Sequence, residues 1–116
     1  YLAAFDVRKR LLAEFDAAFR EVDAIVAPTL PVPAPPIDAE SVRIEGEELD
    51  TRRVVVGHSR PANFTGLPAI SVPCGFTRDG LPVGLQLIGP AFQEATLLRI
   101  ASSYEQATDW GKRHPA

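Results

Sequence analysis

Two apolar runs separated by a short polar segment stand out in the second half of the chain. Residues 69–74 and 83–88 are mostly apolar, and Asp79-Gly80 lies between them. Because glycine adopts a positive φ without a Cβ clash, Asp-Gly at this place predicts a tight turn. We therefore expect antiparallel strands at Ala69–Cys74 and Val83–Ile88. Neither run alternates with polar residues, which predicts interior strands that are covered on both faces.

Helical periodicity is found on both sides of these strands. Residues 2–21 predict an amphipathic helix because apolar side chains recur every three or four positions, with Lys9 as the one charged position on the stripe. Residues 93–108 predict a second helix, with Glu94 in the first turn, where a carboxylate is stabilised by the helix N-terminus. The two apolar faces are Leu2, Phe5, Leu12, Phe15, Phe19 and Val22, and Leu97, Ile100, Ala101, Tyr104 and Thr108.

The segment after the first helix changes character twice. Asp23–Ala27 predicts a short strand, which Pro28 ends. Five prolines fall between Pro28 and Pro36, so this stretch is expected to be extended and outside any sheet interior. A proline-rich spacer and a polyproline ligand for another domain are both compatible with it. Residues 37–51 are acidic and polar, which predicts a solvated loop with a possible hairpin turn at Gly46.

Residues 51–64 favour a helix with Thr51 as its N-cap. The β-branched run at 54–56 lowers the helix propensity, and Pro61 must kink or end the helix. His58 lies in this stretch without a neighbouring cysteine or acidic triplet. A lone histidine in such a setting is more typical of a structural role than of catalysis.

Composition excludes several classes of function. The 116 residues suffice for one domain, and a net charge of −3 gives no basic surface for nucleic acid. No apolar run approaches the ~20 residues that span a bilayer, so no membrane partner is expected and cytoplasmic residence is the default. The single cysteine, Cys74, is expected to be a small buried hydrophobe, and neither a metal nor another cofactor is predicted.

Several ordered motifs resemble one known family. They are Asp-Ala-Ile-Val-Ala-Pro-Thr-Leu-Pro from Asp23, Asn-x-x-Gly-Leu-Pro-Ala-Ile-Ser-Val-Pro-Cys-Gly-Phe from Asn63, Asp-Gly-Leu-Pro-Val-Gly-Leu-Gln-Leu-Ile-Gly from Asp79, and Phe-x-Glu from Phe92. This pattern is similar to the C-terminal part of the amidase signature family. The resemblance implies an α/β fold: a C-terminal fragment of the mixed-sheet amidase signature fold, with helices packing on a mostly apolar sheet.

The resemblance also implies where the chemistry lies. Members hydrolyse amides with a serine nucleophile, a second serine in a cis peptide and a lysine, in a Gly-Ser-rich stretch that we do not find in residues 1–116. No catalytic residue is therefore assigned, and the substrate is expected to be a small-molecule amide. In the family, the proline-rich loop lies beside the acyl-binding side of the cleft, so Pro28, Thr29 and Leu30 are candidate cleft-lining residues. Asn63 is expected to bond to backbone near a helix end.

Two further expectations concern the whole molecule. The chain has no methionine and its strands have few helices to cover them, so we interpret residues 1–116 as a single C-terminal segment without the N-terminal catalytic part. Unpaired strand edges and apolar faces predict a homo-oligomer. Two alternatives stay open: a non-catalytic oligomerising structural module, and the amidase-type component of the glutamine-dependent tRNA amidotransferase. That component carries an aspartate seven residues before the motif asparagine, where this chain has Val56.

Overall fold

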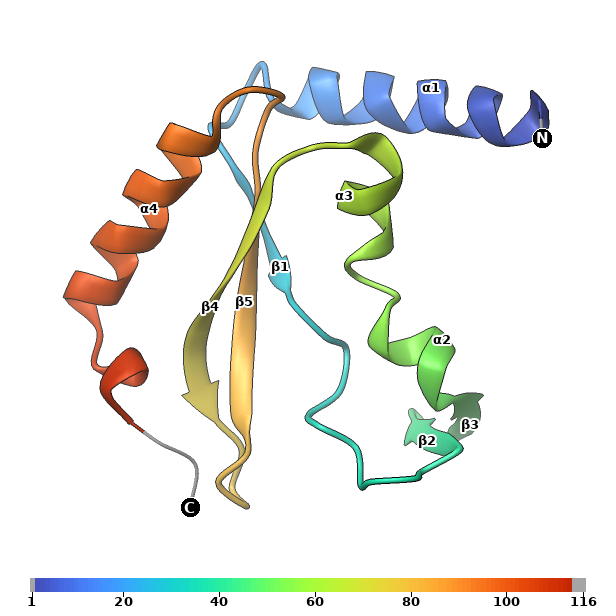
Figure 1. The fold of residues 1–116 in the computed structure, drawn as a ribbon, viewed down its shortest axis with the longest axis vertical. Helices are drawn as coiled ribbons and strands as arrows, with labels where there is room; N and C mark the ends of the chain where they lie inside the picture. Colours follow the sequence, from blue (N-terminus) through green and yellow to red (C-terminus); the bar gives the residue numbers. More distant parts are fainter. Residues whose placement is uncertain (1, 114–116) are drawn as a thin grey trace.

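The computed structural model describes residues 2–113, in which short helices and two antiparallel sheets follow one another (Figure 1). The elements are α1 (Leu2–Ala18), β1 (Ile25–Pro28), β2 (Ser41–Ile44), β3 (Glu47–Asp50), α2 (Thr51–Val55), α3 (Arg60–Thr65), β4 (Ala69–Phe76), β5 (Pro82–Ile88), α4 (Glu94–Ala107) and the 3₁₀ helix η1 (Trp110–Lys112). The α/β fold class expected from the sequence is confirmed, and the predicted strand at 23–27 begins only at Ile25.

The main sheet has the order β1-β5-β4, and both pairings are antiparallel. The predicted hairpin between β4 and β5 is confirmed. Its turn is closed by the Thr77 N–H, which donates to the Leu81 carbonyl over 2.8 Å, and Gly80 has a φ of 80°. Glycine is suited to this conformation because it has no Cβ to clash. The hairpin therefore follows directly from the Asp79-Gly80 signal.

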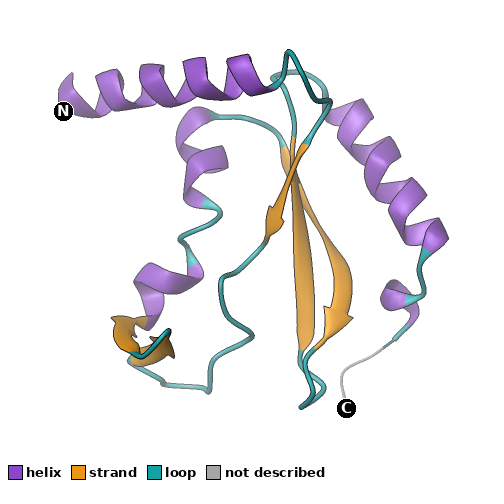
Figure 2. Ribbon diagram, turned by 180° about the vertical axis from the view of Figure 1, so that it is seen from behind, coloured by secondary structure: helices purple, strands orange, loops and turns teal. Residues whose placement is uncertain are grey.

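Helix α4 covers one face of this sheet, as the ribbon from behind shows (Figure 2). Val72, Leu87, Leu97 and Ala101 form a buried cluster between the sheet and α4. Ile100 and Tyr104 pack against the cluster, which confirms the predicted apolar face of this helix. The core of the molecule lies here because β5 contributes alternating side chains to the face that α4 covers.

The expectation that both strands are covered on both faces is wrong for β4. Ala69, Ser71 and Pro73 are exposed, whereas Val72 between them is buried. The strand is at one end of the described sheet, and only the face toward α4 is packed. An apolar composition therefore concealed the alternation, because alanine and proline are apolar residues that here face outward.

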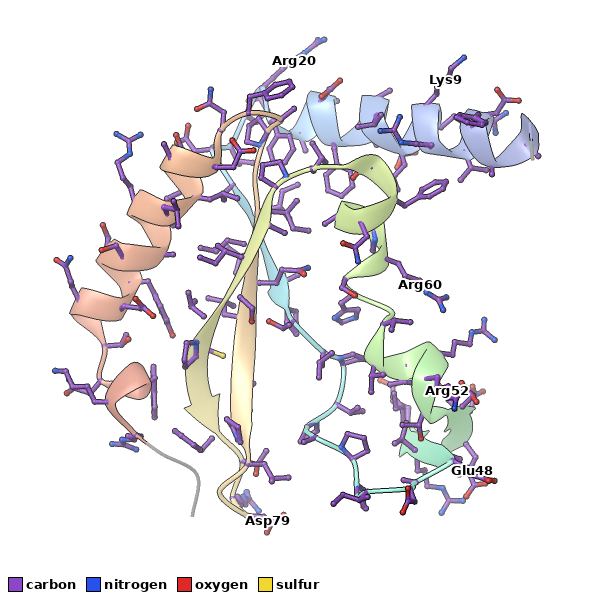
Figure 3. The ribbon with its side chains drawn as sticks, in the orientation of Figure 1. Lys9, Arg20, Glu48, Arg52, Arg60 and Asp79 are labelled. Atoms are coloured by element: carbon purple, nitrogen blue, oxygen red, sulfur yellow. The ribbon has the colours of Figure 1, made fainter. Side chains whose placement is uncertain are left out.

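Helix α1 packs with its second half only. Leu12, Phe15 and Phe19 contact a small cluster of Ala62, Leu67 and Ile88. Toward the N-terminus, the Phe5 side chain is 47% exposed and Val7 is 55% exposed. Figure 3 shows the Lys9 side chain pointing away from the rest of the chain, as expected for the charged position of the stripe.

One arginine joins α1 to α3. The Arg8 guanidinium donates to the carbonyl oxygens of Phe64 and Thr65, over 2.9 Å from Nε and 2.7 Å from Nη2. Both carbonyls belong to the last turn of α3, which Gly66 then ends with a φ of 80°. A cation at this place satisfies carbonyls that have no partner within the helix.

The single helix expected over residues 51–64 is in fact two helices, separated by a turn at residues 56–59. The β-branched run at the end of α2 and Gly57 explain this break, since both have low helix propensity. Pro61 begins the next helix rather than ending the previous one. This place suits proline because the first helical N–H groups need no intrahelical acceptor.

Asp50, not Thr51, is the N-cap of α2. Its Oδ1 accepts a hydrogen bond of 2.8 Å from the Arg53 N–H. The Thr51 hydroxyl is buried and has no hydrogen-bond partner within residues 2–113. Asp50 also ends β3, whose hairpin with β2 turns at Glu45-Gly46, with φ angles of 49° and 91°, as predicted for Gly46.

We expect Asp50→Ala to lower the free energy of unfolding by about 0.5–2 kcal/mol, because the Arg53 N–H loses its acceptor. Urea unfolding measures the change. Asp50→Asn is the matched control and should retain most of the stability, since its side-chain oxygen can accept the same bond. Thr51→Val should be neutral or slightly stabilising, because it removes a buried hydroxyl without a partner. A larger loss from Thr51→Val than from Asp50→Ala would contradict this assignment of the cap.

Candidate functional site

The Pro28–Leu30 segment leaves the end of β1 beside the middle of β5. Pro28 is the last residue of β1 and is paired with Leu85. The Thr29 N–H continues the ladder by donating to the Gly84 carbonyl over 2.9 Å. This segment is therefore fixed to the sheet before the proline-rich stretch departs from it.

A pair of hydroxyls links this segment to β4. Thr29 Oγ1 lies 2.6 Å from Ser71 Oγ, and either hydroxyl can donate the proton. The pair crosses above Gly84, where a side chain would collide with it: a Cβ there would lie 2.8 Å from Thr29 Oγ1 and 2.9 Å from Ser71 Oγ. Glycine at this position of β5 thus permits the close approach of the two hydroxyls.

A cavity of about 380 Å³ opens next to the hydroxyl pair. Thr29 and Leu30 line it, as expected from the sequence, whereas Pro28 does not. Its other lining residues are Pro31, Val32, Pro33, Ala34, Pro82, Val83 and Gly84. None of these side chains carries a charge. We call this space the Thr29 cavity.

His58 and Gln86 were not singled out as site residues, yet they reach the same segment. His58 Nδ1 lies 3.0 Å from the Pro28 carbonyl, and Gln86 Nε2 donates to the His58 carbonyl over 3.1 Å. Gln86 is 5% exposed. A polar residue within the apolar 83–88 run was the one sequence signal that could have pointed to this network, because a buried amide requires partners.

The described residues do not assemble a serine–serine–lysine relay. Ser71 bonds to Thr29, and Lys112 forms an exposed ion pair with Asp109 at 2.6 Å. Lys9 is exposed on α1. The hydroxyl pair consequently has no lysine within bonding distance in residues 2–113. No group of histidine, cysteine and acidic side chains in that range could hold a metal ion.

Cys74 is half-buried rather than fully buried as expected, and its Sγ lies 3.5 Å from the Val83 carbonyl. The strand bulges at this point, between Pro73 and Gly75. A bulge turns neighbouring side chains away from strict alternation, which explains the partial exposure of the thiol.

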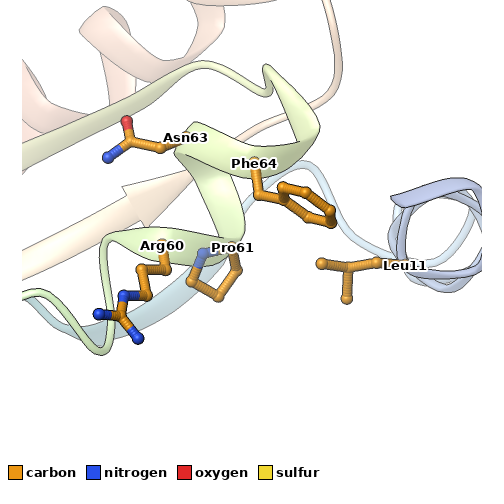
Figure 4. A pocket seen from close by; sticks show the side chains of 5 residues that line it. All are labelled: Leu11, Arg60, Pro61, Asn63 and Phe64. Atoms are coloured by element: carbon orange, nitrogen blue, oxygen red, sulfur yellow. The ribbon is translucent and has the colours of Figure 1, made fainter. Parts of the chain in front are cut away.

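A second cavity, of about 530 Å³, lies between α1 and α3 (Figure 4). Leu11, Arg60, Pro61, Asn63 and Phe64 line it. The Asn63 side chain is exposed and makes no hydrogen bond within residues 2–113, so its expected bond to the backbone is wrong. Thr65 performs that role instead, since its Oγ1 donates to the Pro61 carbonyl over 2.7 Å.

Comparisons with known proteins identify the family. The family model described as Amidase matches residues 1–98. The chain belongs to the amidase signature family. It is 44% identical over 115 residues to the amidase-type (A) component of the glutamyl-tRNA(Gln) amidotransferase of a Synechococcus strain, covering 99% of this chain and 21% of that protein. It is 41% identical, also over 115 residues, to a fatty acid amide hydrolase of Medicago truncatula, covering 99% of this chain and 19% of that protein.

Solved structures agree with this assignment. The chain matches a crystal structure of an amidase with a TM-score of 0.86 and 31% identity, over 92% of this chain and 24% of that one. The chain therefore spans about a fifth of the length of the curated amidase relatives that it matches. Within residues 2–113, no helix has the length and apolar character needed to cross a membrane.

Proposed function

We propose that the chain is the C-terminal, cleft-forming part of an amide hydrolase. In this proposal, residues 1–116 form one segment of an amidase domain, which converts a carboxamide and water to a carboxylate and ammonia or an amine. The nucleophile relay of two serines and a lysine belongs to the part of the domain outside this chain. A small-molecule amide is the substrate.

The observation that carries the proposal is the Thr29 cavity on a chain of this family. Two of the three cleft residues expected from the resemblance line that cavity, and both approach it from the sheet that the motifs form. The cavity has the uncharged lining typical of a site for an acyl group. The separation of scaffold from nucleophile accounts for the missing relay, since acyl transfer needs a hydrogen-bonded line of side chains that residues 2–113 do not supply.

We expect the purified 116-residue chain to hydrolyse no aryl amide, such as 4-nitroacetanilide, because it has no activated nucleophile. The protein encoded by the longest reading frame that ends with this chain should hydrolyse it. Release of 4-nitroaniline, followed by absorbance, measures both. Turnover by the 116-residue chain that Ser71→Ala abolishes would refute the proposal. A reading frame that starts directly before Tyr1 would favour the non-catalytic module instead.

The amidase-type component of a tRNA amidotransferase is the second candidate, favoured by the name of the 44% identical relative. Val56 counts against it: this residue caps the end of α2 with an exposed aliphatic side chain, where the resemblance leads us to expect an aspartate that recognises glutamine. Ammonia release from glutamine, compared with 4-nitroaniline release from the aryl amide, distinguishes the two candidates in the longer protein.

A further inference from the structure

His58 connects two segments that are far apart in the sequence. It lies in the turn between α2 and α3, and this turn is held by the Gly57 N–H, which donates to the Val54 carbonyl, and by the Arg60 N–H, which donates to the Val56 carbonyl. The His58 ring reaches Pro28, and its backbone carbonyl receives the Gln86 side chain. One residue thus bridges β1 and β5 from outside the sheet.

The acceptor of this bond defines the state of the ring. A carbonyl oxygen can only accept, so His58 Nδ1 carries a proton and donates it to Pro28 over 3.0 Å. Strand β1 is at the end of the described sheet, where outward carbonyls have no ladder partner. His58 supplies the missing donor at the last residue of that strand.

This bond acts next to the candidate site. Pro28 directly precedes Thr29, whose N–H bonds to Gly84 and whose hydroxyl bonds to Ser71. We propose that His58 is a positioning residue: by holding the Pro28 carbonyl, it keeps Thr29 against β5 and so sets the wall of the Thr29 cavity for an apolar, uncharged acyl group. The part of this proposal that concerns the acyl group rests on the proposed function.

Geometry also specifies what the wall would select. Beyond the hydroxyl pair, the lining consists of proline, aliphatic and glycine residues. An aliphatic acyl chain gains by burial there, whereas a charged acyl group would lose its hydration without finding a counter-charge. An acetyl group is too short to depend on the position of a wall formed by residues 29–34. Long and short acyl groups therefore separate a positioning effect from a general loss of activity.

Hydrogen exchange of the Thr29 amide tests the positioning role independently of activity. In the 116-residue chain, His58→Phe should speed exchange at Thr29 about 3- to 10-fold, the effect of one lost hydrogen bond, while the Gly89 and Thr77 amides stay unchanged. His58→Asn retains an N–H donor near the position of Nδ1 and should restore slow exchange. Ser59→Ala is the matched control in the same turn, because its hydroxyl bonds only to Val56. Unchanged exchange at Thr29 in His58→Phe would overturn the proposal.

Kinetics of the longer protein test the acyl-group part. His58→Phe should raise KM for 4-nitrohexananilide about 3- to 10-fold relative to wild type and leave kcat/KM for 4-nitroacetanilide within about 2-fold, and His58→Asn should reverse the change. An equal loss for both anilides would overturn the assignment of the cavity to the acyl group. If exchange at Thr29 responds as expected but the wild-type protein cleaves neither anilide, the proposed function fails while the positioning role stands.

Discussion

Leu97→Ala should lower the free energy of unfolding by about 2–5 kcal/mol, the largest stability change that we expect from one substitution in this chain. The Leu97 side chain is 3% exposed and belongs to the cluster that joins α4 to the sheet. Its truncation removes apolar contacts and leaves a cavity, because the strands below cannot collapse into the space. Urea or thermal unfolding of the purified chain, followed by circular dichroism, measures the loss.

The neighbouring leucine provides a matched control. Leu98 is on the same helix but is 58% exposed. Leu98→Ala changes the same atoms and raises helix propensity slightly, so it should alter stability by no more than about 0.5 kcal/mol. Similar losses for the two variants would mean that α4 does not pack on the sheet through the face described above.

Gly89→Ala should cost about 1–3 kcal/mol by the opposite mechanism, overpacking. A Cβ at position 89 would lie 2.9 Å from Leu97 Cγ, 3.0 Å from Cδ2 and 3.2 Å from Cδ1. The buried leucine must move, since both residues are enclosed between β5 and α4. The same unfolding measurement gives the size of the loss.

Two comparisons isolate this contact. Gly111→Ala should be almost neutral, because no atom lies within 4 Å of a Cβ at that position. In the Leu97→Ala background, Gly89→Ala should cost less than in the wild type, because the colliding atoms are gone and the new methyl group fills part of the cavity. Strict additivity of the two substitutions would show that Gly89 is required for a reason other than Leu97.

Local signals were sufficient to predict the hairpin and the two long helices. The Asp79-Gly80 turn and the three-to-four-residue spacing of apolar side chains act within a few residues, so they can be recognised in sequence. The capping of α2 was misassigned because Asp50 and Thr51 are adjacent residues that are both common N-caps. Only the direction of the Asp50 side chain toward the Arg53 N–H distinguishes them.

The candidate site was less predictable because it depends on strand register. Pairing places Ser71 opposite Gln86 and Pro73 opposite Gly84, while β1 brings Thr29 to the other side of β5. A shift of one residue would turn these side chains to the opposite face. The resemblance pointed to Thr29 and Leu30, but no local pattern joined them to Ser71 or His58.

The strand order has a consequence for synthesis on the ribosome. Strands β1 and β4 each pair with β5 and not with each other in the described sheet. Since a chain emerges N-terminus first at ~5–20 residues per second, the interval from the end of β1 to the start of β5 takes roughly 3–11 s. Throughout that interval the nascent chain carries strand segments whose common partner has not been made. Translation halted before Pro82 leaves this sheet without a single pair of strands, however much of the remaining chain has already folded.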